Sequence, residues 1–422
     1  MTQTARTPAP SSASAPTGRR ALVAWLAADA MALTGTRLAA VALPWLALTT
    51  TGSPTAAGLV AFAELTPLVV AKVLSGPLID RLGARRVAVA CDAASVLPVL
   101  AIPALHHLDA LALPTLLALV AVVGLLRGPA DAARDSLVPA LAEATGQPLE
   151  RITGLSSTIE RTSSLVGAAV AAGLVALVGA ADALVVNAAG FALAALVLGV
   201  GLRTVGHGST DTDDVPYLLR LRAGWRFLRG EPVVLALTVM IACTNLLDVA
   251  FTAVLLPVWA VETGAGVGAV GLLLAVMSGT SVVGSLVAAA WAARMPRFTV
   301  YVVAFLVCGL PRFLVLAWSQ DLTLPVVVMA VAGLASGFLN PVVGAVFFER
   351  IPTPLVGRVS AMSTAVAWAL MPLGGLVGSG LLAVLDVGAA LTSAGVLYLV
   401  ITLAPLVDRR FRAMGRPAGE VS

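Results

Sequence analysis

Charged side chains are scarce in this chain of 422 residues. Asp, Glu, Lys and Arg together make up 11% of it, and Lys72 is its single lysine. Hydrophobic residues make up 59%, and the mean hydropathy is +0.99. A soluble globular domain carries about 25% charged residues and is far less apolar. The composition therefore excludes a soluble globular protein and indicates an all-α membrane protein.

The sequence also lacks the motifs of enzymes and of ATP-driven pumps. It contains no phosphate-binding loop, no metal-ligand spacing and no nucleophile motif. Cys91, Cys243 and Cys308 are odd in number and far apart within apolar runs, which favours core packing over disulfides. His106 and His107 are adjacent but have no further ligand pattern around them. We therefore expect no enzyme activity, no cofactor and no metal ion.

Long apolar runs recur along the whole chain. A helix needs about 20 apolar residues to cross a hydrocarbon layer of about 30 Å. The breaks between the runs contain the Gly, Pro, Thr and Asp that are typical of turns. Twelve membrane-spanning helices are predicted, at about 22–48, 56–79, 87–105, 111–131, 156–178, 183–202, 233–257, 267–292, 298–318, 325–347, 360–384 and 387–407.

Basic residues avoid every second break between these spans. If the amino terminus is cytoplasmic, the outer loops contain no Lys or Arg, and the Arg residues gather in the other loops. This is the pattern of the positive-inside rule. We therefore predict a multi-pass protein of the cell (inner) membrane with both termini in the cytoplasm. The formal net charge of +4 reflects this topology and attraction to the anionic lipid bilayer, and it does not indicate nucleic-acid binding.

The two halves of the chain are related. Matching residues recur at one constant offset: Pro44 with Pro257, Gly58 with Gly271, and Arg81 with Arg294. Two parallel six-helix repeats joined by a linker form the architecture of a rocker-type secondary transporter. The predicted organisation is a disordered cytoplasmic tail at 1–20, a six-helix bundle at 21–202, a cytoplasmic linker at 203–231, a second bundle at 232–408 and a cytoplasmic tail at 409–422. The linker has the pattern of a basic amphipathic helix, and we expect the protein to be a monomer.

A cluster of charges follows the second span, in the stretch SGPLIDRLGARR at 75–86. Its first Gly permits close helix approach and its second a tight turn. The Asp can pair with an Arg or with a helix amino terminus across the bundle, and the last two Arg residues can hold the loop at the headgroups. The alternative is a topology anchor without a gating role. The predicted gating motif consists of Gly76, Asp80, Arg81, Gly83, Arg85 and Arg86.

This stretch closely resembles the signature loop between the second and third helices of the major facilitator superfamily. Residues 35–59, 127–141 and 349–382 are similar to the 12-helix drug:proton antiporter branch, which includes macrolide-efflux and enterobactin-exporter-like proteins. Ala168 stands where many of these antiporters have a proline in the fifth helix. The resemblance implies the major facilitator fold, with 12 transmembrane helices in two pseudo-symmetric six-helix bundles, and proton-coupled efflux.

Ionisable residues within apolar spans cost about 2.5–3.5 kcal/mol each and are therefore functional candidates. Glu64, Asp248 and Asp29 are the candidates for proton coupling. Glu64 is the first choice, because Pro67 can kink its helix and admit water, and Arg37 is expected as the nearby cation. The candidates for the substrate cavity are Arg37, Asn245, Arg312 and Asn340. Salt bridges alone are the alternative explanation for acids and bases at one depth.

Together these features predict a secondary active transporter that exports a hydrophobic or amphipathic small molecule, such as a drug, an antibiotic or a siderophore-like compound, in exchange for protons. A lysophospholipid or nutrient facilitator of the same fold is the first alternative. The alternative of another class is a non-transporting membrane sensor or scaffold. A scaffold would need neither paired repeats nor acids at mid-depth.

Overall fold

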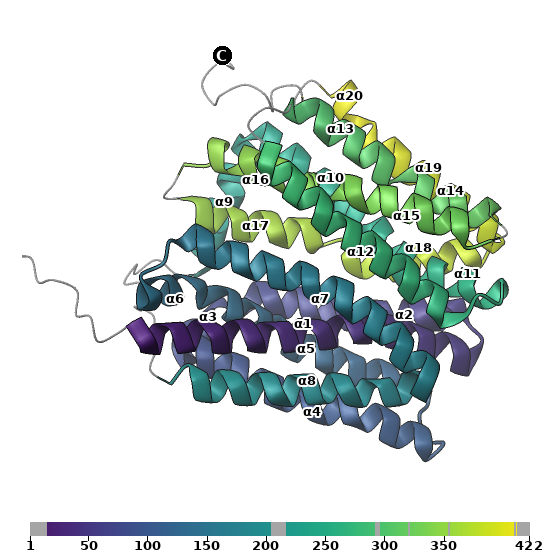
Figure 1. The fold of residues 1–422 in the computed structure, drawn as a ribbon, viewed down its shortest axis with the longest axis horizontal. Coiled ribbons are helices and arrows are strands. Elements are labelled where there is room, and N and C mark those ends of the chain that lie inside the picture. The colour runs from purple at the N-terminus through teal and green to yellow at the C-terminus, as the bar shows by residue number, and fades with distance from the viewer. Residues whose placement is uncertain are drawn as a thin grey trace, which may run out of the picture.

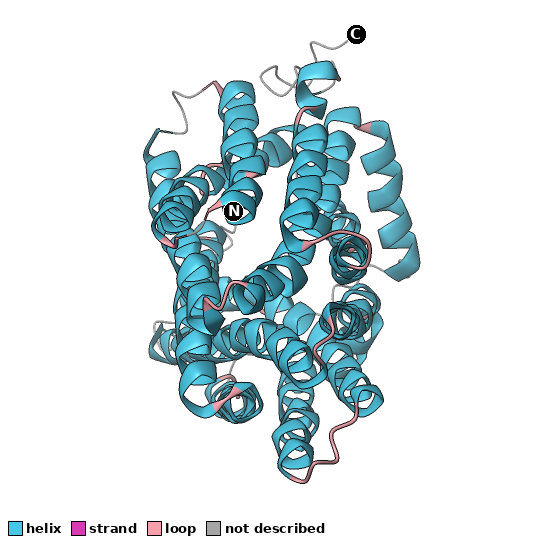
Figure 2. Ribbon diagram, turned by 90° about the vertical axis from the view of Figure 1, so that its right-hand side faces the viewer, coloured by secondary structure: helices cyan, strands magenta, loops and turns pink. Residues whose placement is uncertain are grey.

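The computed structural model describes residues 15–203, 217–291, 296–319, 321–352, 355–408 and 411. These residues are almost entirely helical and include no β-strand. Figure 2 views the helices nearly end-on, from the end of the molecule at which α11 lies. The prediction of an all-α protein is confirmed.

Residues 15–203, the described part of the first half, form eight helices that lie together in the lower part of Figure 1. Their bounds are α1 Ala15–Thr51, α2 Pro54–Leu74, α3 Gly76–Leu82, α4 Ala84–His107, α5 Leu113–Ser136, α6 Val138–Thr145, α7 Leu149–Val178 and α8 Ala180–Gly201.

The second half forms the upper part of Figure 1. Several of its spans are divided into two helices that continue in one direction. The bounds are α9 Tyr217–Gly230, α10 Pro232–Ala250, the π-helical segment η1 Phe251–Leu255, α11 Leu256–Glu262, α12 Gly266–Trp291, α13 Arg297–Cys308, α14 Leu310–Trp318, α15 Thr323–Ser336, α16 Leu339–Arg350, α17 Val356–Trp368, α18 Met371–Leu382, α19 Val387–Thr402 and α20 Ala404–Val407.

Twelve segments of the described residues are long and apolar enough to cross a membrane, which confirms the predicted number. Span ends differ from the prediction mainly in the fourth span, which runs over 113–145 rather than 111–131 because α6 continues α5. We call the end at which α3, α6 and α9 lie the basic end, since the Arg residues of 75–86 lie there (Figure 1).

The amino-terminal boundary was predicted wrongly. Helix α1 begins at Ala15, so the last residues of the expected disordered tail at 1–20 are helical. A Cβ on Gly18 would lie 2.0 Å from the carbonyl oxygen of Ala144, so this first turn packs closely on α6. Residues 1–14 lie outside the described residues.

Two other predicted boundary segments are partly described. In the expected tail at 409–422, Phe411 is only 3% exposed and stacks on Tyr301 at 6.4 Å between ring centroids. In the expected linker, α9 packs on α17, and a Cβ on Gly224 would lie 2.5 Å from the carbonyl oxygen of Arg358. The linker residues 204–216 lie outside the described residues.

Helix breaks in the second half place charged residues in the interior. The π-helical turn η1 precedes Pro257, which has no N–H to donate to the helix, and Asp248 lies one turn before η1. Gly309 and Pro311 separate α13 from α14, so that Arg312 lies in the first turn of α14. The η1 segment contacts α1 and α2 of the first half, and Gly309 lies against Tyr398 within the second half.

The two halves make tight contact toward the end opposite the basic end, where α2 lies on α18 and α7 on α12. A Cβ on Gly58 would lie 2.3 Å from the carbonyl oxygen of Gly375. A Cβ on Gly271 would lie 1.9 Å from the Cβ of Ala172. Glycine is therefore required at both positions, because any side chain would push the two halves apart.

Candidate functional site

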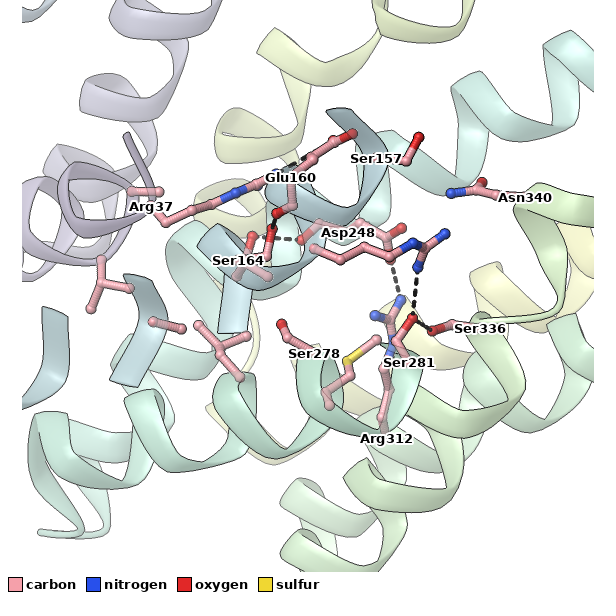
Figure 3. Close-up of a pocket in the computed structure, with 17 residues that line it drawn as sticks. Arg37, Ser157, Glu160, Ser164, Asp248, Ser278, Ser281, Arg312, Ser336 and Asn340 are labelled. Carbon is pink, nitrogen blue, oxygen red and sulfur yellow. Dashed lines mark hydrogen bonds and ion pairs between the residues drawn. The ribbon is translucent and has the colours of Figure 1, made fainter. Parts of the chain in front are cut away.

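A central cavity of about 480 Å³ lies between the two halves of the molecule (Figure 3). The first half contributes residues of α1 and α7, and the second half contributes residues from α10 to α16. Its lining is rich in charged side chains and hydroxyl groups. The charged residues are Arg37, Glu160, Arg161, Asp248 and Arg312, and the polar uncharged residues are Ser157, Ser164, Thr252, Ser278, Ser281, Ser336 and Asn340.

One ion pair belongs to the second half. The Arg312 guanidinium donates to the Asp248 carboxylate, and it also lies 4.9–5.1 Å from the ring centroids of Phe251, Phe313 and Tyr398. The side chain of Arg312 is 4% exposed, whereas that of Asp248 is 39% exposed. Asp248 therefore presents its carboxylate to the cavity, while aromatic rings enclose the cation.

The charges on the first half are held more loosely. Arg37 Nη2 lies 3.8 Å from Glu160 Oε1, which is an ion pair without a hydrogen bond. The Arg37 Nε is buried and has no hydrogen-bond partner among the described residues. Arg161 Nη1 donates to the Ser281 hydroxyl at 3.4 Å and so reaches across to the second half. These side chains retain donors that a ligand can use.

The predicted cavity residues are only partly brought together. Arg37, Arg312 and Asn340 line the cavity, but Asn245 is not among the lining residues. Asn245 Nδ2 instead donates to the carbonyl oxygen of Ala367 at 3.0 Å, joining α10 to α17. The structure therefore does not bring Asn245 together with the other predicted cavity residues.

Glu64 lies inside the first half and not in the cavity. It is 8% exposed and accepts a hydrogen bond from Arg127 Nη1 at 2.9 Å. Helix α5 approaches closely here, since a Cβ on Gly124 would lie 2.1 Å from the carbonyl oxygen of Glu64. The expected partnership with Arg37 is wrong, because Arg37 lies on the face of α1 that lines the cavity.

Glu64 belongs to a larger group of charges, which we call the buried charge network. Arg127 also lies 3.9 Å from Asp131, and Arg134 lies 3.2 Å from Asp131 on the same helix. Four carboxylates thus share two guanidinium groups. The members are Asp29, Glu64, Asp92, Asp131, Arg127 and Arg134.

Arg134 is the centre of this network. Its guanidinium lies 3.1 Å from Asp92 and 3.5 Å from Asp29, and all three residues are 8% exposed or less. Asp29 is thus removed from the cavity, as Glu64 is. Prediction from the sequence overlooked Arg134 as a site residue, although the spacing of Arg127, Asp131 and Arg134 by four and then three residues places all three on one face of α5.

The predicted gating motif lies at the basic end. Gly83 has φ 84°, the left-handed region that favours glycine, and forms the turn between α3 and α4. Arg85 donates to the carbonyl oxygen of Gly199 in α8, so it binds protein rather than headgroups alone. Asp80, Arg81 and Arg86 are exposed. Gly76 begins α3 and is half-buried.

A second contact joins the halves nearer the basic end. The ammonium group of Lys72 lies 3.2 Å from Asp135 Oδ2 in α5. It also lies 4.7 Å from the ring centroid of Trp368 in α17. The single lysine of the protein therefore links α2 and α5 with the opposite half.

Comparisons with known proteins agree with this architecture. The family model described as Major Facilitator Superfamily matches residues 26–259 and 238–421. The chain is 32% identical over 355 residues to a protein of Mycobacterium tuberculosis (strain ATCC 25618 / H37Rv) named Multidrug efflux pump Tap, covering 83% of this chain and 84% of that protein. It is 29% identical over 364 residues to the protein of the same name from Mycolicibacterium fortuitum, covering 85% and 88%.

Solved structures share the fold at low sequence identity. The nucleoside transporter NupG superposes with a TM-score of 0.70 at 14% identity, covering 94% of this chain and 100% of that one. A bacterial homologue of the human lysosomal transporter Spinster, in an inward-facing conformation, gives 0.69 at 13% identity, with 95% and 97% covered. The motif at 75–86, the twelve spans, the two related halves and the match of the family model along nearly the whole chain all agree, and the protein is a membrane transporter that belongs to the major facilitator superfamily.

Proposed function

We propose that this protein is a proton-coupled efflux transporter for hydrophobic or amphipathic small molecules. The observation that carries the proposal is the central cavity, which lies between the halves and is lined from both of them by charged and hydroxyl side chains. Its relatives named Multidrug efflux pump Tap support the direction of transport and the class of cargo.

The tight contacts support a rocking mechanism. The backbones of the two halves touch at Gly58 and Gly375 and near Gly271, whereas Lys72 meets Trp368 nearer the basic end through side chains, so the basic end is the side on which the halves separate more easily. A substrate enters the cavity from that side, the halves rock about it, and the contacts at the glycines open to release it. The Lys72 contact with Trp368 reforms or breaks as the basic end closes or opens.

The buried charge network supports the coupling to protons. With four carboxylates and two guanidinium groups, it carries a formal excess of two negative charges when every member is ionised. Buried charge without a counter-charge is costly, so binding of protons by this group relieves an unfavourable excess. Helix α1 contributes to both, because it carries Asp29 of the buried charge network and Arg37 of the cavity.

The function is tested in a bacterial host whose own drug-efflux genes are deleted. Expression of the protein should lower accumulation of some members of a panel of unrelated antibiotics, and a protonophore should restore their accumulation. Downhill uptake of a nutrient or lysophospholipid that is insensitive to protonophore would overturn export in favour of a facilitator. Unchanged accumulation of every compound by a well-expressed protein would overturn transport of drugs.

We expect the basic end to face the cytoplasm. A cytoplasmic-reporter fusion at His207 should be active, since this position lies in the Arg-rich linker, and one at Asp321 should be inactive, because it lies in a loop without Lys or Arg. Complementary reporters that are active only outside the cytoplasm give the matched control. The reverse pattern would contradict the orientation.

Asp80→Asn should impair transport more than folding. The side chain is exposed at the basic end, so its charge is not needed for core packing. As a member of the predicted gating motif, it is expected to stabilise the state in which this end is closed. We expect a several-fold lower transport rate with unchanged membrane abundance, measured by transport in vesicles and by quantitative blotting. Equal losses of both would leave the motif with an anchoring role only.

A further inference from the structure

We infer that the central cavity selects small molecules that carry an acidic group beside hydroxyl or other polar groups, and that Arg161 is the residue that selects for the acid. This inference rests on the proposed transport function and names the chemical class of its cargo. Multidrug sites that hold lipophilic cations do so with carboxylates and aromatic faces. In this cavity each of the two carboxylates, on Glu160 and Asp248, lies within 3.8 Å of a guanidinium group.

The carboxylate on the second half is already neutralised. Asp248 accepts a hydrogen bond from Arg312, so the charge of this partly exposed carboxylate is already balanced by a buried guanidinium. The rings of Phe251, Phe313 and Tyr398 already lie around that guanidinium. The described residues that line the cavity include no aromatic side chain. The guanidinium of Arg312 therefore fills the place between these rings and Asp248 that a cationic ligand would otherwise use.

The balance of charge favours an anion. Three guanidinium groups and two carboxylates line the cavity, which leaves a formal charge of +1 when all are ionised. Arg161 accounts for this excess, because its partner among the described residues is a hydroxyl, that of Ser281, and not a carboxylate. Arg37 is also incompletely paired: its buried Nε has no hydrogen-bond partner among the described residues, and its ion pair with Glu160 is 3.8 Å long. An acidic group bound beside Arg161 would accept a charge-assisted hydrogen bond from it, and the unpaired donor of Arg37 is available to the same ligand or to another of its polar groups.

Hydroxyl groups surround this position on both halves. Ser157 and Ser164 lie on α7, and Ser278 and Ser281 face them from α12, as Figure 3 shows. A serine hydroxyl both donates and accepts hydrogen bonds, so it can bind polar groups of either kind. The cavity therefore matches an acid with neighbouring polar groups better than a purely apolar compound.

The inference is tested with two dyes that share a xanthene core and differ in charge. Fluorescein carries a carboxylate and a phenolate at mildly alkaline pH, whereas rhodamine 6G is an esterified cation. Fluorescence-polarisation titrations of the purified full-length protein in detergent compare their binding. We expect fluorescein to bind at least about tenfold more tightly, the factor that one charge-assisted hydrogen bond contributes.

Substitution of one arginine separates charge from general dye binding. Arg161→Gln should weaken fluorescein binding by about tenfold and leave rhodamine 6G binding unchanged or tighter. Arg161→Lys should recover part of the loss, because it restores the charge without the planar fork. Arg151→Gln is the matched control, since Arg151 lies on the same helix, is exposed outside the cavity and donates to Gln147. It should bind both dyes as the wild type does, and thermal unfolding should verify that all variants are folded.

Three results would overturn the inference. Equal or tighter binding of rhodamine 6G by the wild type contradicts the class of cargo, and protonophore-sensitive efflux of antibiotics would then still support the proposed function. Failure to bind either dye also contradicts the class, and the efflux assay decides the function separately. Unchanged fluorescein binding by folded Arg161→Gln removes this residue as the selecting group.

Discussion

Arg134→Leu is expected to remove most of the folded protein from the membrane. The guanidinium lies within 3.5 Å of three carboxylates, on Asp29, Asp92 and Asp131, and the residue is 2% exposed. Removing one partner of a buried ion pair leaves an uncompensated charge and costs about 3–5 kcal/mol. Thermal unfolding of purified protein in detergent and the yield from membranes measure the loss.

The design of the controls tests the cause. Adding Asp92→Asn to Arg134→Leu should recover part of the stability, because it removes one of the stranded charges. Arg151→Leu, on the exposed surface of α7, should change the unfolding temperature little. A stable Arg134→Leu protein, or a combined variant that is no more stable than the single one, would show that the buried charge network does not hold α1, α4 and α5 together.

Glu64→Gln is expected to abolish accumulation against a gradient while leaving substrate binding measurable. A glutamine can still accept the hydrogen bond from Arg127, so the packing of α2 on α5 is retained. Glutamine cannot exchange a proton. Asp131, 3.9 Å away, then remains the carboxylate that balances the charge of Arg127 at all times. Vesicles carrying the variant should therefore equilibrate substrate but not concentrate it when a pH gradient is imposed.

A direct proton measurement completes this experiment. Adding substrate to wild-type protein in weakly buffered detergent solution should release protons, and Glu64→Gln should release none. Glu143→Gln is the matched control, because that glutamate is exposed on α6 and should behave as the wild type. If Glu64→Gln still concentrates substrate with an unchanged pH dependence, Glu64 is half of a structural ion pair, and Asp29 and Asp248 become the residues to test.

Features that depend on length and composition along the chain could be predicted from the sequence. An apolar run of about 20 residues that crosses a membrane must pair its own backbone polar groups and therefore forms a helix. The twelve spans thus follow from hydropathy alone. The start of α1 could not be predicted, because Ala15 to Arg20 are not apolar enough to signal a helix. They become helical where Gly18 packs on Ala144 of α6, a contact between residues far apart in the sequence.

In the candidate site, the depth of a residue in the membrane could be predicted, but the direction of its side chain could not. Counting residues from the span ends gives the depth of Glu64 and Arg37, but it does not give the direction in which each side chain points. Arg37 points to the cavity and Glu64 to α5. Spacing within one helix does define a face. Arg127, Asp131 and Arg134 are four and then three residues apart, so the sequence already indicated that they lie together on one face. The contact between Asn245 and Ala367 depends on helix packing and had no such signal.

The single lysine has a practical consequence. Apart from the amino terminus of the chain, Lys72 is the only primary amine that an acylating reagent can modify. Its side chain is 20% exposed in this structure and lies against Trp368 of the opposite half, so it is shielded while the halves are together near the basic end. Modification stops at one acyl group in the transmembrane region, and its extent is read from the intact mass of the protein. The rate of acylation therefore measures the fraction of time for which the two halves are apart at this end.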